Sequence, residues 1–173
     1  MKNLLSGLFQ RDRFAPPPPK IASCSFYAAY GLGTAYALHG IVAVWPQGPL
    51  ADHLVDLKDH DALGTHILGR LKLSMDKPDG GKPNHLAQSA NFQSQMDQFR
   101  EVTGRRPRPF ESALSLINIT RQADQLLFDL HQPVRGRYAF ESHTPADDQP
   151  RLAAPYSATE VGNFVANLLK DPK

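Results

Sequence analysis

The chain has little cysteine and almost no net charge. Its single cysteine, Cys24, leaves 173 residues without an intramolecular disulfide or a thiolate-rich metal site. Such scarcity is typical of proteins from a reducing cytoplasm, where we expect this one to be located. Nineteen Lys and Arg residues nearly balance 17 Asp and Glu residues. The net charge of +2 therefore gives no general reason to expect a nucleic-acid or membrane partner.

The sequence also lacks an evident secretory or membrane-spanning segment. Its start, MKNLLSGLFQRDR, has a short apolar run followed by charges without a small-residue cleavage site. Residues 21–51 contain no Asp, Glu, Lys or Arg and are long enough for a span. Polar and flexible residues nevertheless lie through the middle of this stretch, namely Gly31, Gly33, Thr34, His39 and Gly40. A buried sheet explains the stretch better than a membrane helix.

Common catalytic motifs are missing as well. There is no G-x-S-x-G motif and no phosphate-binding P-loop. The stretch GLGTAY (31–36) resembles a dinucleotide-binding turn, with Asp52 at a distance suited to a ribose. However, Tyr36 occupies the third glycine position, and too few residues separate this turn from IVAVW for a crossover helix. Cys24 lies in an apolar run and is expected in the core. We therefore expect no enzyme activity and no cofactor.

What is present predicts a single α+β domain, in which two or three helices cover an antiparallel or mixed sheet. Residues 1–20 are expected to be a tail and a spacer, because APPPPK (15–20) favours a polyproline conformation. Residues 21–173 are expected to form the domain, which is long enough for one core and too short for two.

The first strands are expected where aromatic and β-branched residues are concentrated. SFYAAY (25–30) and IVAVW (41–45) predict two or three strands, with the glycines of residues 31–40 serving as turns. The following stretch, 46–61, alternates turn formers with scattered apolar residues and is expected to be a surface loop.

An antiparallel hairpin is predicted later in the chain. LINITR (116–121) and LLFDLHQ (126–132) flank the turn QADQ. Ile117 and Ile119 are expected on one face, and Leu126, Phe128 and Leu130 on another. Residues 135–142 could add an edge strand, and residues 143–155 are expected to form a loop.

Helices are predicted at four places. Leu63, Ile67 and Leu71 mark an apolar face over residues 61–73, with Asp59 or Asp61 suited to capping. A second face, marked by Phe92, Met96 and Phe99, is stopped by Gly104, and a short helix is expected from Phe110. The last helix has the spacing of a capping box and a continuous apolar stripe, formed by Val161, Phe164, Val165, Leu168 and Leu169. The box pairs Ser157 with Glu160, and Tyr156 with Val161 can form a hydrophobic staple.

Two of these helices carry a glycine within the apolar face. Gly64 lies beside Leu71 on the helical projection, and Gly162 holds the corresponding place in the last helix. Glycine there sacrifices about 1 kcal/mol of helix propensity relative to alanine. We interpret both glycines as positions where another backbone approaches closely.

The two glycine-marked helices have related sequences. Aligning Gly64 with Gly162 also aligns Leu63 with Val161, Ile67 with Val165 and Leu71 with Leu169. Three segments, DALGTHILGRLKLS (61–74), LINITR…LLFDL (116–130) and APYSATEVGNFVANLL (154–169), together resemble the immunity proteins of bacterial contact-dependent growth inhibition, the CdiI family.

This resemblance implies a cytoplasmic protein without catalytic activity. Such a protein binds and neutralises the carboxy-terminal toxin domain of a large secreted effector, often by covering a nuclease active site. If the toxin is a nuclease, its groove is basic, and an acidic surface of this chain is the natural toxin-binding candidate. The acidic residues in question are Asp52, Asp56, Asp59 and Asp61.

Two alternatives remain at the level of sequence. A small metal-dependent hydrolase could use His53, Asp56 and His60, although the acids and histidines of residues 52–66 match no recognised zinc or calcium pattern. His66 is more simply explained as a partly buried histidine that is hydrogen-bonded to the backbone. An RNA-binding accessory domain could use the chain's arginines, Arg100, Arg105, Arg106, Arg108, Arg121, Arg135 and Arg137.

Overall fold

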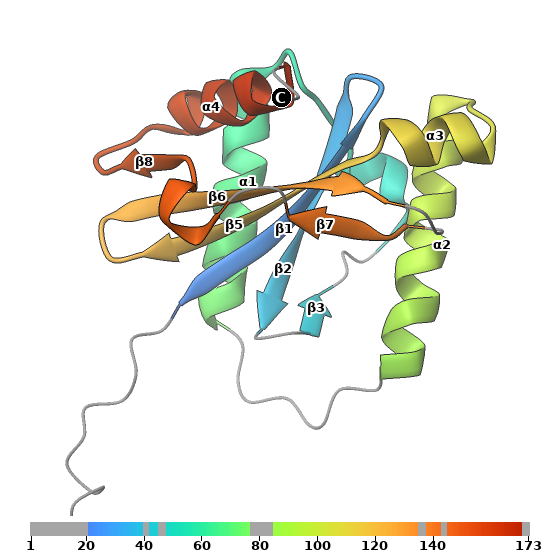
Figure 1. Ribbon diagram of the computed structural model, residues 1–173, viewed down its shortest axis with the longest axis horizontal. Coiled ribbons are helices and arrows are strands. Elements are labelled where there is room, and N and C mark those ends of the chain that lie inside the picture. The colour runs from blue at the N-terminus through green and yellow to red at the C-terminus, as the bar shows by residue number, and fades with distance from the viewer. Residues whose placement is uncertain are drawn as a thin grey trace, which may run out of the picture.

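The computed structural model describes residues 21–39, 42–44, 48–76, 85–134, 138–142 and 145–170. The predicted tail and spacer, residues 1–20, lie outside this range. Figure 1 shows a central twisted sheet with helices on both of its faces. This single α+β domain confirms the predicted fold class.

The sheet has eight strands, and every strand pair is antiparallel. Its main path runs β3-β2-β1-β5-β6-β7. The strands of this path are β1 (Ala22–Ala29), β2 (Leu32–His39), β3 (Val42–Val44), β5 (Ser115–Gln122), β6 (Gln125–Pro133) and β7 (Phe140–Ser142). Two short strands complete the edges, with β4 (Val55–Asp56) pairing with β2 and β8 (Arg151–Ala153) pairing with β6.

Helices α1 (His60–Asp76) and α4 (Ala158–Lys170) cover what we call the first face of the sheet, and α1 passes behind the strands in Figure 1. Their apolar stripes pack with β1, β5 and β6 into one core cluster, which contains Phe26, Ile67, Ile119, Phe128 and Val165. All five of these side chains are fully buried. The stripes predicted from sequence are therefore the core-facing surfaces.

The helices α2 (His85–Thr103) and α3 (Pro107–Ala113) cover one end of the second face. There a separate cluster gathers Tyr36, Met96, Phe99 and Phe110. The rings of Phe99 and Phe110 meet edge to face, with centroids 5.4 Å apart. Of the helices expected here, α2 ends before Gly104 as predicted, while α3 begins at Pro107 rather than Phe110.

The expected turn role of the glycines in residues 31–40 is only partly right. Gly31 lies in the β1–β2 turn with φ +82°, but Gly33 lies inside β2. A Cβ added to Gly33 would fall 2.2 Å from Cζ of Phe26. The ring of Phe26 therefore occupies the space that a side chain would need, and this glycine serves packing rather than chain reversal.

Two stretches expected as loops contain regular structure. Residues 46–61 include the 3₁₀ turn η2 (Leu50–His53) and strand β4, and residues 143–155 include η3 (Ala146–Asp148) and strand β8. Both strands have only two or three residues, too few for a periodic signal. Their pairing with the edges of longer strands is a tertiary event.

The predicted hairpin is present, but its faces need correction. Ile117 pairs with Leu130, and Ile119 pairs with Phe128. Because directly paired residues point to the same side of a sheet, all these side chains lie on the first face, in the core beneath α1 and α4. The turn itself is Ala123–Asp124, with Ala123 at φ +51°.

No helix in the part of the chain that the structure describes is both long and apolar enough to cross a membrane.

Candidate functional site

The glycines of α1 and α4 mark a backbone-to-backbone crossing. A Cβ added to Gly64 would lie 1.7 Å from the carbonyl oxygen of Ala158, and one added to Gly162 would lie 1.8 Å from that of His60. Each glycine therefore sits against the first turn of the other helix. This confirms the close approach inferred from sequence, and it fixes the two helices as one rigid unit.

The start of α4 is locked both locally and to α1. The Ser157 N–H donates to Glu160 Oε2 at 2.6 Å, and the Glu160 N–H donates to Ser157 Oγ at 3.2 Å, which confirms the capping box. The Ser157 N–H and the Ser157 hydroxyl both donate to Glu160 Oε2, and they lower the pKa of the Glu160 carboxyl. Thr159 Oγ1 then donates to Asp61 Oδ1 at 3.0 Å, joining the two helix starts.

The four aspartates predicted to bind toxin are all exposed, and three of them also have structural roles. Asp59 caps α1, because its Oδ1 accepts the Ala62 N–H at 3.0 Å. Asp56 Oδ1 accepts the Lys58 N–H at 2.9 Å, and Asp61 accepts from Thr159. Asp52 lies on η2. The run is held in a fixed shape, and its contact with a toxin stays a prediction.

The alternative metal site does not form as an arrangement of three ligands. His53 lies on η2, Asp56 on β4 and His60 at the start of α1. Among the described residues, no group of three His, Cys, Asp or Glu side chains could hold a metal ion. The geometry therefore gives no support to the hydrolase reading based on these residues.

His66 has the structural role expected from sequence. Its Nε2 accepts the backbone N–H of Ala35 at 3.1 Å. Burial, followed by the nearby positive charge of Arg70 and by His53, lowers the pKa of His66 to about 4. The imidazole is therefore neutral at pH 7, as an acceptor nitrogen requires.

Cys24 is a buried core residue on β1, as expected. Burial raises the pKa of its thiol to about 12, against a small opposing effect of Arg70. The thiol therefore stays protonated at pH 7, and it is a poor nucleophile because the reactive species is the thiolate.

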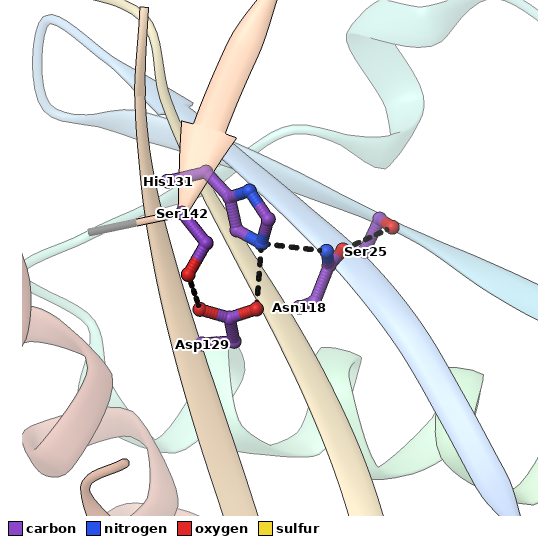
Figure 2. A network of polar contacts seen from close by, with 5 residues as sticks. All are labelled: Ser25, Asn118, Asp129, His131 and Ser142. Atoms are coloured by element: carbon purple, nitrogen blue, oxygen red, sulfur yellow. Dashed lines mark hydrogen bonds and ion pairs between the residues drawn. The ribbon is translucent and has the colours of Figure 1, made fainter. Parts of the chain in front are cut away.

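A polar network that the sequence analysis missed crosses the second face (Figure 2). It links four strands through five side chains, Ser25 on β1, Asn118 on β5, Asp129 and His131 on β6, and Ser142 on β7. We call these five residues the polar row. On β1 and β7, Ser25 and Ser142 stand two residues from Tyr27 and Phe140, which pack against the aromatic cluster of α2 and α3.

The contacts of the polar row run from side chain to side chain. Ser25 Oγ donates to Asn118 Oδ1 at 2.8 Å, and Asn118 Nδ2 lies 2.9 Å from His131 Nε2. The same ring nitrogen lies 2.9 Å from Asp129 Oδ2, while Ser142 Oγ donates to Asp129 Oδ1. Three neighbouring strands and the short β7 are thus joined by side chains in addition to their backbone ladders.

The row contains Ser, His and Asp, but its geometry is not that of a hydrolase triad. The hydrogen bonds of the two serines in this row go to other partners, from Ser25 to Asn118 and from Ser142 to Asp129. Nucleophilic catalysis needs a hydroxyl within hydrogen-bond reach of its base. The row is therefore an ordered polar surface, half-buried along most of its length. The alternation of Asp129 and His131 with apolar neighbours was the signal that could have identified it.

The five of these arginines that the structure describes do not gather into a single surface. Arg105, Arg106 and Arg108 are exposed at the α2–α3 corner, where the Arg105 guanidinium stacks 4.7 Å from the ring centroid of Tyr30. Arg100 is engaged with Asp97 and Glu101, and Arg121 lies at the far end of β5. Arg135 and Arg137 lie outside the described residues.

Comparisons with known proteins show similarity of fold. A protein of unknown function from Neisseria meningitidis superposes with a TM-score of 0.65 at 17% identity, covering 84% of this chain and 93% of that one. A chain of the CdiA-CT/CdiI toxin and immunity complex from Yersinia pseudotuberculosis superposes with a TM-score of 0.61 at 13% identity, covering 87% and 95%. No family model and no curated protein sequence matches.

Proposed function

We propose that this chain is an immunity protein, which binds and neutralises the toxin domain of a cognate contact-dependent growth inhibition effector. The observation that carries the proposal is the fold likeness along nearly the whole chain to a chain of a CdiA-CT/CdiI toxin and immunity complex. The likeness agrees with the independent resemblance of the two glycine-marked helices and the hairpin to that family. Its site of action is the cytoplasm of the producing cell.

The physical character of the described surface supports the same proposal. An inhibitor that acts by binding needs a rigid framework more than a reactive group, since preorganised surfaces lose little entropy on association. The crossing of α1 and α4 supplies that rigidity. The polar row supplies ordered hydrogen-bonding groups, and its hydrogen bonds do not join a serine hydroxyl to the imidazole.

The direct test is protection and copurification. The coding sequences beside this gene are searched for a large effector, and its carboxy-terminal domain is expressed with and without this chain. We expect cells that express the toxin domain to grow only when this chain is expressed with it, and we expect a complex of the two proteins on size exclusion. Toxicity unrelieved by this chain, together with no complex at micromolar concentrations, would contradict the proposal.

We further propose that the toxin is a nuclease whose basic groove meets the exposed aspartates. Replacing Asp52, Asp56, Asp59 and Asp61 by Asn removes four charges and retains side-chain oxygens at the positions that cap α1 and meet Thr159. At low salt, the association rate should fall at least tenfold. An unchanged rate would remove these residues from the interface, and nuclease assays of the toxin test its activity separately.

A further inference from the structure

A pocket lies between α3 and the β6–β7 pair. Its volume is about 410 Å³, within the range of sites that hold a large side chain or a small ligand. Helix α3 contributes Arg108, Glu111 and Ser112 to the lining, and the sheet side contributes Val134, Tyr138 and Phe140.

The aromatic wall of this pocket is already fixed in place. Tyr138 has φ +56°, and its hydroxyl donates to Asp97 Oδ1 at 3.1 Å. Its ring packs edge to face on Phe92, with centroids 5.8 Å apart, and Phe140 packs in the same way on Tyr27 at 5.9 Å. A ligand entering here meets a preformed wall and does not have to order it.

The polar side of the pocket is suited to an anion. Arg108 is exposed and forms no ion pair with any described residue, whereas Glu111 has an interaction of its own. A guanidinium can bind a carboxylate through two parallel hydrogen bonds, and the hydroxyl of Ser112 adds a further donor. The exposed Arg106, two residues before Arg108, increases the positive potential at this corner.

The pocket lies next to the polar row along β6 and β7. Pro133, also in the lining, pairs with Phe140, and the next pair on the same face is His131 with Ser142. An occupant that emerges from the pocket along β6 and β7 therefore meets the hydroxyl, imidazole, carboxylate and carboxamide groups of the polar row. This adjacency favours a side chain attached to a larger polar surface over an isolated small molecule.

We propose that this pocket receives a carboxylate-bearing side chain of the toxin domain and anchors it on Arg108, while the polar row contacts the surface around it. The proposal rests on the proposed immunity function and locates part of its interface. The interface then includes a positive anchor point on the second face, in addition to the acidic run at the start of α1.

The test measures the affinity of the purified full chain for the cognate toxin domain by calorimetry. Arg108→Gln should raise the Kd at least tenfold, and Arg108→Lys should also weaken binding because the paired hydrogen bonds are lost. Arg151→Gln is the matched control, because Arg151 is an exposed arginine on β8, away from the pocket. It should change the Kd less than twofold. Urea unfolding verifies that all variants are folded.

The outcomes separate the two proposals. If the wild-type chain binds the toxin domain and Arg108→Gln binds equally well, the pocket assignment fails and the immunity function stands. If the wild-type chain binds no toxin domain, the immunity function fails, and the pocket is tested directly by NMR. Acetylated glutamate amide should then cause saturable shifts at Ser112 and Phe140 that acetylated glutamine amide does not. Equal shifts with both probes, or none, would overturn the assignment.

Discussion

The two faces of the sheet are closed in different ways. On the first face, α1 and α4 touch through their backbones, and the core beneath them is continuous and apolar. On the second face, α2 and α3 cover an aromatic cluster at one end, while the polar row is half-buried along most of its length and the Arg108 pocket opens beside α3. The difference indicates that the first face contributes most of the stability, whereas the second face carries polar groups and a pocket that a partner could contact.

The largest effect is expected from Gly64→Ala, which tests the contact on the first face. Because the added Cβ would meet a backbone carbonyl at 1.7 Å, α1 and α4 must separate, and we expect a loss of at least about 3 kcal/mol or no folded protein. Urea unfolding followed by circular dichroism measures the change. Gly69→Ala is the control within the same helix, since its Cβ would meet nothing within 4 Å. That variant should be neutral or up to about 1 kcal/mol more stable. Similar stabilities for the two variants would refute the close crossing.

The second test is the acid stability of the first face. The folded pKa of His66, about 4, lies below the unfolded value of 6.5, so the unfolded chain binds more protons between these limits. The contribution of His66 is therefore complete above pH 6.5 and is lost as the pH falls toward 4. The expected loss is about 3 kcal/mol. Urea midpoints measured across this range should decline.

His66→Gln provides the control for that decline. Its amide oxygen can still accept the Ala35 N–H, but the side chain does not titrate. The stability profile of this variant should be flatter than that of the wild type between pH 6.5 and 4. Parallel profiles would show that other groups cause the acid sensitivity.

A smaller effect is expected at the start of α4. Ser157→Ala removes the hydroxyl that caps the helix and should cost about 1 kcal/mol in urea unfolding. Ser157→Thr keeps a hydroxyl at this position and should recover most of the loss. If both variants are as stable as the wild type, the capping box contributes nothing to the joined helix starts.

The smallest stability effect is predicted on the second face. Asn118→Ala breaks the centre of the polar row, but the row is only half-buried, so we expect a loss of about 0.5 to 1 kcal/mol. The free energy of toxin binding should change by more than the free energy of unfolding, because the row is proposed to contact the toxin. Thr120→Ala, also on β5 and on the same face, is the matched control. A loss of stability as large as that of Gly64→Ala would show that the second face is structural after all.

Several features were readable from the sequence because they depend on residues close together in the chain. The capping box at Ser157 and Glu160 closes within one helical turn, and the stripe through Ile67 follows helical periodicity. Gly64 and Gly162 stood out because glycine lowers helix propensity, and an apolar helix face normally carries larger side chains. The histidine at position 66 lay at the edge of that face, which was sufficient to predict a backbone partner.

Other features could not be read because their causes are distant in sequence. Gly33 is required by the ring of Phe26 on a neighbouring strand, and the two-residue strand β4 exists only because β2 offers it an edge. The polar row joins residues up to 93 positions apart, as in the bond from Ser25 to Asn118. The alternation around Asp129 and His131 places these two on one face of β6, but only the register of β1, β5 and β6 aligns them with Asn118 and Ser25.

The sequence by itself determined the helices, the hairpin, the α+β class and the need for close contact at two glycines, because local hydrogen bonding and periodic burial specify these. Tertiary structure alone decided that the two glycines face each other's helix, and that Arg108 borders a pocket next to the polar row. These are contacts between surfaces, and strand register and helix placement set them only when the whole core has packed.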